Sequence, residues 1–116
     1  MSLPVEKAAI TTHILNLESG RPAADVQAYL YGPDSSEPIA SARTDADGRV
    51  MQWDAPVELQ PGIYKLQFAI GDWFARQERD SFYPEIKIAF RVANTREHYH
   101  VPLLLNAHGY STYRGS

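Results

Sequence analysis

Hydrophobic and polar residues alternate in several short segments of this chain, and a period of two is typical of β-strands with one buried face. The clearest segment covers residues 85–92, where four apolar side chains alternate with polar or small ones: Ile86, Ile88, Phe90 and Val92. The same pattern, or a run of β-branched residues, predicts further strands at residues 9–17, 26–31, 39–44, 49–53, 63–70 and 98–105. A last strand is expected after a turn at residues 106–109.

Clusters of turn-forming residues separate these segments. The sequences SGRP (residues 19–22) and GPDSS (residues 32–36) interrupt the pattern, and so does PG at residues 61–62. The sequence DADG (residues 45–48) predicts a tight turn in which Gly48 adopts a positive φ. Many short strands with such turns between them are typical of a β-sandwich or barrel.

Residues 72–80 (DWFARQERD) lack the strand alternation. Asp72 is suited to cap the start of a helix, and three residues follow it at helical spacing: Trp73, Phe74 and Gln77. We therefore expect one short helix here. The whole pattern predicts a single all-β domain over residues 1–116, a sandwich of two antiparallel sheets with that one helix.

Composition narrows the class of protein. Hydrophobic residues make up 44% and charged residues 22% of the chain, values close to those of soluble globular domains. A net charge of -3 with dispersed Lys and Arg argues against binding to nucleic acid or to an anionic membrane. No apolar run approaches the ~20 residues that span a bilayer. The chain has no Cys, and residues 1–7 lack the apolar core of a signal peptide, so we expect a cytoplasmic protein.

Histidine is the usual acid or base near neutral pH, which makes the four His residues the first candidates for chemistry. In the predicted strand 98–105, His98 and His100 lie on the face opposite the apolar side chains. His13 lies within the apolar first strand, and Arg49 follows the tight turn. By pattern alone, a structural or solvated role is more common than a catalytic one for each of these residues.

Two metal sites are conceivable from spacing. His98 and His100 form a His-x-His pair on one strand face, but no third ligand stands at an obvious motif distance. Residues 45–48 resemble part of a calcium loop, but the later acidic residues are out of register, and the turn interpretation is the simpler one. The sequence also has no Gly-rich phosphate loop and no Gly-x-Ser-x-Gly nucleophile motif.

Several blocks of the chain resemble the transthyretin-related 5-hydroxyisourate hydrolases, in the order of that family and over nearly the whole length. They are ITTHILN (10–16), GRPAA (20–24), TDADGR (44–49), FYPEI (82–86), HVPLLL (100–105) and GYSTYRGS (109–116). The closing Tyr-Arg-Gly-Ser separates the family's enzymes from transthyretin, the hormone carrier of the same fold. Two departures lie outside the functional positions: Asp25 replaces a usual Gly, and residues 107–108 replace a Pro-aromatic pair.

The resemblance implies a transthyretin-like (prealbumin) β-sandwich that hydrolyses 5-hydroxyisourate in urate degradation. It also implies a homotetramer with active sites in a central channel, and no metal or cofactor. Carried over residue by residue, the catalytic positions are His13, Arg49, His100 and Ser116. The substrate-binding positions are Tyr113 and Arg114, whereas His98 and His108 match no catalytic position.

A general-base mechanism fits these residues, with one of His13 and His100 activating water and Arg49 holding the developing oxyanion. The sequence does not decide which His is the base. The alternatives of another class are a non-enzymatic carrier of an aromatic ligand in the same channel and a structural adhesion-type sandwich. The intact tail and the three basic positions favour the enzyme.

Overall fold

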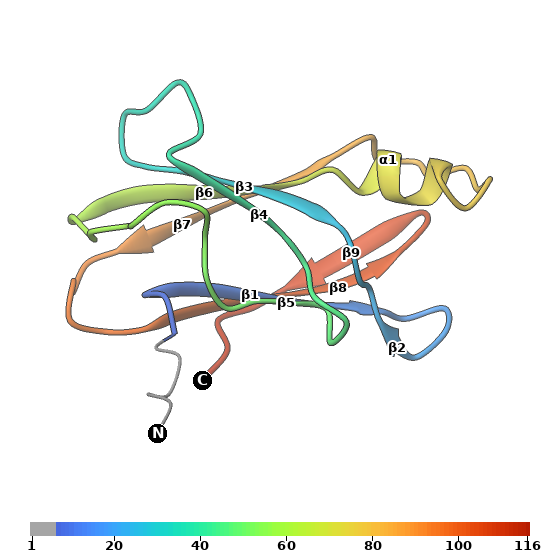
Figure 1. Ribbon diagram of the computed structural model, residues 1–116, viewed down its shortest axis with the longest axis horizontal. Helices are drawn as coiled ribbons and strands as arrows, with labels where there is room; N and C mark the ends of the chain where they lie inside the picture. Colours follow the sequence, from blue (N-terminus) through green and yellow to red (C-terminus); the bar gives the residue numbers. More distant parts are fainter. Residues whose placement is uncertain (1–6) are drawn as a thin grey trace.

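Two β-sheets pack face to face around one hydrophobic core, and a short helix covers one end (Figure 1). In chain order the elements are β1 (Ile10–Asn16), β2 (Arg21–Pro22), β3 (Gln27–Tyr31), β4 (Ala40–Arg43), β5 (Arg49–Val50), β6 (Gly62–Phe68), α1 (Ile70–Ala75), β7 (Ile86–Val92), β8 (Tyr99–Asn106) and β9 (Gly109–Thr112). The computed structural model describes residues 7–116. The prediction about a signal peptide concerns the first residues, and residues 1–6 lie outside the described part.

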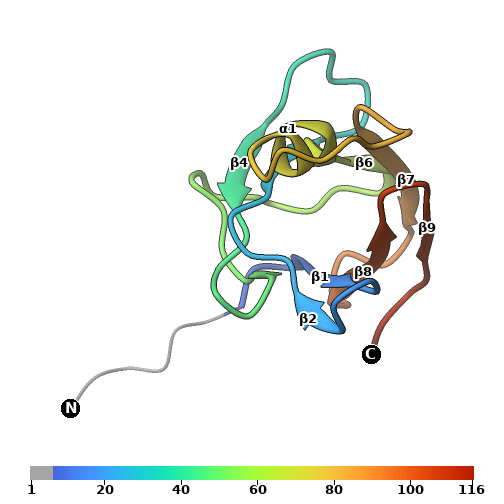
Figure 2. The same ribbon diagram turned by 90° about the vertical axis from the view of Figure 1, so that its right-hand side faces the viewer.

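Sheet A has the strand order β2-β1-β8-β9, with β5 also paired to β1, and sheet B has the order β4-β3-β6-β7. Figure 2 shows the two layers from one end. The all-β sandwich is confirmed, but the prediction of two purely antiparallel sheets is wrong for sheet A, because β1 and β8 pair in parallel. The chain passes through all of sheet B between these two strands, and so long a connection allows β8 to return in the direction of β1.

The alternation of apolar residues predicts the inner faces correctly. The fully buried side chains of β3, β6 and β7 are those that the period of two assigns to the core: Ala28, Leu30, Tyr64, Leu66, Phe68, Ile86 and Val92. Sheet A contributes Ile10, Ile14, Leu103 and Leu105 from the opposite layer. Each large apolar side chain removed from water stabilises the fold by about 1.5–3 kcal/mol, so this core holds both sheets in place.

The helix begins three residues earlier than a cap at Asp72 predicts, and it ends at Ala75, within the predicted segment 72–80. Its first residue is Ile70 and its N-cap position is Ala69, so the expected cap at Asp72 is wrong. Ile70 and Phe74 lie one turn apart and both are buried, and the packing of these two side chains sets the start of the helix. Asp72 lies in the first turn, where a negative charge interacts favourably with the helix dipole.

Two short strands also differ from the prediction. Residues 21–22 were expected to lie in a break, but they form β2, which pairs with Leu15 and Asn16 after a turn in which Gly20 has φ 71°. The predicted strand 49–53 is reduced to the two residues of β5. Beyond it the indole of Trp53 donates a hydrogen bond to the Ile10 carbonyl at 2.9 Å and closes this edge of the core.

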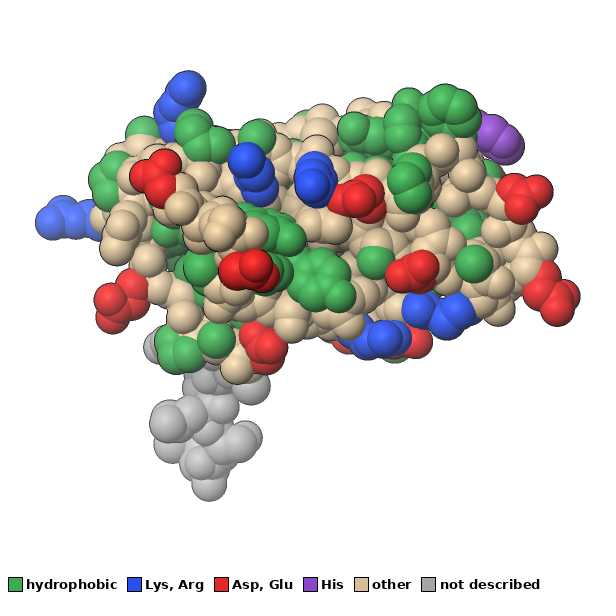
Figure 3. Space-filling view, turned by 90° about the horizontal axis from the view of Figure 1, so that it is seen from above, with side chains coloured by type: hydrophobic (Ala, Val, Ile, Leu, Met, Phe, Trp, Pro, Cys, Tyr) green, Lys and Arg blue, Asp and Glu red, His purple; other side chains and the backbone are tan. Residues whose placement is uncertain are grey.

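The outer face of sheet B has no large area of like charge among the described residues. Acidic and basic side chains are interspersed there with hydrophobic ones (Figure 3). Within the part of the chain that the structure describes, no helix is long enough to cross a membrane.

Candidate active site

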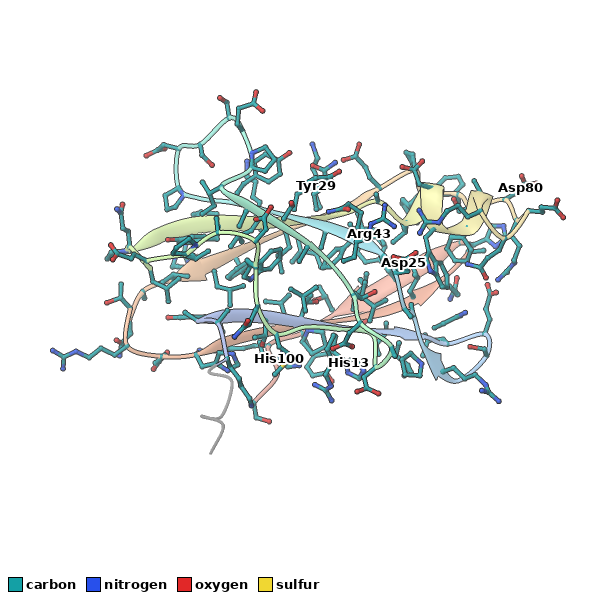
Figure 4. All side chains as sticks on the ribbon, in the orientation of Figure 1. His13, Asp25, Tyr29, Arg43, Asp80 and His100 are labelled. Carbon is teal, nitrogen blue, oxygen red and sulfur yellow. The ribbon has the colours of Figure 1, made fainter. Side chains whose placement is uncertain are left out.

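The outer face of sheet A carries His13, Arg49 and His100. Strand β1 lies between β5 and β8, with His13 paired to Arg49 and Thr11 paired to His100. Paired residues of adjacent strands project to the same face of a sheet, so these four side chains share one surface. Figure 4 shows His13 and His100 on the side of sheet A that faces away from sheet B.

The intervening residues confirm this orientation. Thr12 on β1, Val50 on β5 and Val101 on β8 form the next paired row, and all three are buried against the core. Because side chains alternate along each strand, His13 and His100 must project outward. Both are partly exposed.

The turn at residues 45–48 fixes the position of Arg49. One carboxylate oxygen of Asp45 accepts hydrogen bonds from the backbone N–H groups of Asp47 (2.9 Å) and Arg49 (3.0 Å). Gly48 has φ 74°, as predicted, and a Cβ there would lie 2.5 Å from the Ile14 carbonyl oxygen. The guanidinium of Arg49 has no hydrogen-bond acceptor among the described residues, so its donors are available to a ligand.

The C-terminal tail (residues 113–116) crosses this face next to His100. Strand β9 is antiparallel to β8, and the same register continues to an isolated bridge between His100 and Gly115. The backbone N–H of Gly115 donates to the His100 carbonyl at 2.8 Å. Gly115 therefore lies directly on the His100 side of the sheet, and the exposed Ser116 follows it.

Tyr113 and Arg114 lie between the end of β9 and the bridge of Gly115 to His100. Tyr113 borders a groove between the two sheets, and 56% of its surface is exposed. The Arg114 guanidinium instead pairs with the Glu97 carboxylate at 3.1 Å and lies 4.6 Å from the centroid of the Tyr99 ring. In the single chain, Arg114 thus anchors the tail to the edge of the sandwich.

The charge state of His100 follows from its surroundings. Burial lowers the pKa of His100, and the positive charge of Arg49 lowers it further, followed by smaller effects of His98, His13 and Lys7. His100 is therefore a neutral imidazole at neutral pH and can accept a proton. Burial, and then Lys7, also lowers the pKa of His98.

Two further residues belong to this site: Thr11, which was not predicted, and His98, which was a candidate by pattern but matches no catalytic position of the family. The hydroxyl of Thr11, which is 1% exposed, lies 3.0 Å from His98 Nε2 and 2.8 Å from His100 Nδ1. Strand alternation placed His98 on the face of His100, and the same alternation could have placed Thr11 on the face of His13. No other His, Asp or Glu of the described residues joins them in a group of three arranged to hold a metal ion.

The site face is shallow in one chain. A groove of about 300 Å³ lies between the free edges of the two sheets, lined by β7, β8, β9 and the start of the tail. It reaches His100 but is not lined by His13 or Arg49. The three basic side chains thus lie on an open surface that a second molecule could cover.

Comparison with known proteins assigns the family. The sequence profile of the HIUase/Transthyretin family matches residues 10–115. The probable 5-hydroxyisourate hydrolase of Schizosaccharomyces pombe is 45% identical over 114 residues, which cover 93% of this chain and 91% of that protein. The structure of Klebsiella pneumoniae 5-hydroxyisourate hydrolase superposes with a TM-score of 0.82 at 37% identity, covering 92% of this chain and 98% of the other.

Transthyretin from Sparus aurata has a TM-score of 0.85 but only 22% identity, covering 94% of this chain and 97% of the other, a likeness of fold alone. The family profile and the hydrolase relatives match on sequence over nearly the whole chain. The chain therefore belongs to the HIUase/transthyretin family.

Proposed function

We propose that this chain is a 5-hydroxyisourate hydrolase, which converts its substrate to 2-oxo-4-hydroxy-4-carboxy-5-ureidoimidazoline in purine degradation. The observation that carries the proposal is the convergence of His13, Arg49 and His100 from three strands onto one face. The hydrolase names of the relatives support the substrate. A neutral base beside a fixed cation is the combination that water attack on an amide requires.

In this mechanism His100 accepts a proton from water as the water oxygen bonds to C6 of the substrate. The Arg49 guanidinium donates to the oxygen on C6, which becomes negative in the tetrahedral intermediate. The C6–N1 bond then breaks, and N1 takes the proton back from His100. The lowered pKa of His100 keeps its imidazole neutral and able to accept this proton, and His13, on the same face of the sheet, orients the water.

The tail completes the substrate pocket. Tyr113 lines a groove that reaches His100, and Ser116 follows the glycine that bridges to His100, so both can hydrogen-bond the polar edge of the substrate ring. The contacts of Arg114 with Glu97 and Tyr99 support a role in ordering the tail, in place of direct substrate binding. An ordered tail is required, because four residues at a chain end otherwise fray.

A homotetramer would enclose the site. Strands β7 and β9 each pair with only one neighbour and form one edge of each sheet. The groove between these edges and the exposed Phe82 and Tyr110 suit pairing with a second copy of the chain. Two such dimers facing each other through sheet A would exclude bulk water from the shallow site. Sedimentation velocity should give four times the 13.0 kDa chain mass, and a monomer would contradict this arrangement.

The decay of 5-hydroxyisourate, generated by urate oxidase and followed by ultraviolet absorbance, tests the activity. Wild type should accelerate the decay strongly, and His100→Asn should lower kcat by about 100-fold or more. The control is His108→Asn, because His108 is exposed on the β8–β9 turn, and it should match wild type. No acceleration by folded wild type would favour the carrier alternative, and an aromatic-ligand binding screen would then follow. The cytoplasmic location, expected from the cysteine-free sequence, stays part of the proposal and is tested by cell fractionation.

A further inference from the structure

One hydroxyl group, that of Thr11, connects two imidazole rings on the outer face of sheet A. Thr11 Oγ1 lies 2.8 Å from His100 Nδ1 and 3.0 Å from His98 Nε2, and both are hydrogen-bond distances. The two rings are stacked, with centroids 6.3 Å apart and planes inclined by 20°. Thr11 is buried, His100 is partly exposed and His98 is exposed, so the chain of contacts runs from the site face to solvent.

The single hydroxyl proton of Thr11 couples the tautomers of the two rings. A threonine hydroxyl has one proton, so it can donate to only one of the two ring nitrogens and must accept from the other. If His100 Nδ1–H donates to Thr11, the hydroxyl donates to His98 Nε2, and His100 Nε2 is left unprotonated as a base. If His98 Nε2–H donates to Thr11, the hydroxyl donates to His100 Nδ1, and His100 Nε2 carries a proton. The hydroxyl thus links the tautomer of His100 to that of His98.

We infer that Thr11 and His98 form a proton relay that serves His100. The inference rests on the proposed function, in which His100 removes a proton from water. As the water O–H bond breaks and His100 Nε2–H forms, His100 Nδ1–H passes to Thr11 Oγ1, and the hydroxyl proton of Thr11 passes to His98 Nε2. His100 stays neutral and His98 becomes the imidazolium. When N1 of the substrate takes the proton from His100 Nε2, both transfers reverse and every group regains its starting proton.

The charges around the two rings favour this direction. The charged and titratable groups that act on His100 are Arg49, His98, His13 and Lys7, none of them acidic. On His98 only Lys7 acts as a charge among the described groups. Burial is the first cause that lowers the pKa of both rings, but Arg49 acts only on His100 and His98 is the more exposed residue, so a positive charge is better tolerated on His98. Thr11 and His98 contact no substrate and are positioning residues: they fix the tautomer of His100 and accept its Nδ1 proton.

The test compares variants that separate the hydrogen bond from the proton transfer. Thr11→Val removes the hydroxyl at nearly constant shape, and Thr11→Ser retains it. His98→Gln keeps a side-chain amide that can bond to Thr11 but cannot accept a proton. We expect kcat to fall about tenfold or more in Thr11→Val and His98→Gln, with KM within about twofold, and Thr11→Ser to retain most of the activity.

Two readouts distinguish a relay from a structural role. Nitrogen NMR of the His100 ring should report protonated Nδ1 in wild type and His98→Gln, and a mixed tautomer in Thr11→Val. The dependence of kcat on the fraction of heavy water should indicate that several protons move in the rate-limiting step in wild type and one in His98→Gln. Wild-type kcat in an active His98→Gln enzyme would overturn the relay alone. An unchanged tautomer of the His100 ring in Thr11→Val would overturn the relay even if this variant lost activity. A wild type that did not hydrolyse 5-hydroxyisourate would instead overturn the proposed function.

Discussion

Gly115 packs against the imidazole ring of His100. A Cβ at position 115 would lie 2.5 Å from His100 Cδ2 and 3.2 Å from Pro102 Cγ, closer than carbon atoms normally approach. The tail can therefore pass this close to the His100 ring only because residue 115 has no side chain. The position of the tail and the orientation of the His100 ring depend on each other.

Replacing Gly115 by Ala should therefore impair the site without unfolding the protein. We expect Gly115→Ala to displace the His100 ring or the tail and to lower kcat/KM at least about tenfold, since small displacements of catalytic groups have effects of this size. The matched control is Gly109→Ala, where a Cβ meets only Asn106 Oδ1 at 3.7 Å. Equal activity of the two variants, with equal melting temperatures, would contradict the contact described here.

The charge of Arg49 should be measurable at His100. Because Arg49 lowers the pKa of His100, Arg49→Gln should raise that pKa in an NMR titration. Arg49→Lys keeps the charge and should leave the pKa near its wild-type position. Both variants should lose most of their activity, because Lys lacks the planar donor fork of Arg. A pKa of His100 that does not respond to Arg49→Gln would place Arg49 too far away to act on the reaction.

Stability should fall in weak acid. The pKa of His98 and that of His100 are lower in the folded chain than the usual value near 6.5, so the unfolded state binds protons first as the pH falls. The free energy of unfolding is therefore fully retained above pH 6.5 and decreases below it, until the folded-state pKa values are passed. Urea unfolding at pH 7.5 and 5.5, at one protein concentration, should show this loss in wild type. The double variant His98→Asn/His100→Asn should show a smaller loss, and an equal loss would argue against these two groups.

Asp25 adopts the backbone conformation that suits the glycine usual at this position. Its φ is 65°, and its side chain forms an exposed ion pair with Arg43 at 3.0 Å. Asp25→Gly should change the free energy of unfolding by no more than about 0.5 kcal/mol, since an exposed ion pair contributes little. Asp25→Ala should lower it by about 1 kcal/mol, because Ala keeps the Cβ but lacks the short polar side chain that lets Asp adopt this conformation. Similar stability of the two variants would contradict the assigned backbone conformation.

The sequence predicted the positions of the strands well, because burial of one face imposes a period of two that is visible locally. It did not predict the parallel pairing of β1 with β8, because the partner of a strand is determined by contacts distant in the chain. The start of the helix was misplaced for a related reason. A capping residue is a weak local preference, and the burial of Ile70 outweighs it.

The candidate site was predicted in part. The family resemblance supplied the residues on the site face, and the strand register brings His13, Arg49 and His100 together there. Thr11 was not identified and His98 was given no role, because a hydroxyl shared between two rings depends on the parallel register of two strands far apart in sequence. The contact of Arg114 with Tyr99 was likewise not visible from the tail sequence alone.

The most direct test of the account is the deletion of residues 113–116. The core and the strand pairings through Thr112 do not include these residues, so the truncated chain should fold and should show the sedimentation of wild type. Its hydrolysis of 5-hydroxyisourate should fall to near the spontaneous rate, because Tyr113, the bridge of Gly115 to His100, and Ser116 are lost together. Near-normal hydrolysis by the folded, truncated protein would contradict an active site built from the face of sheet A and the tail.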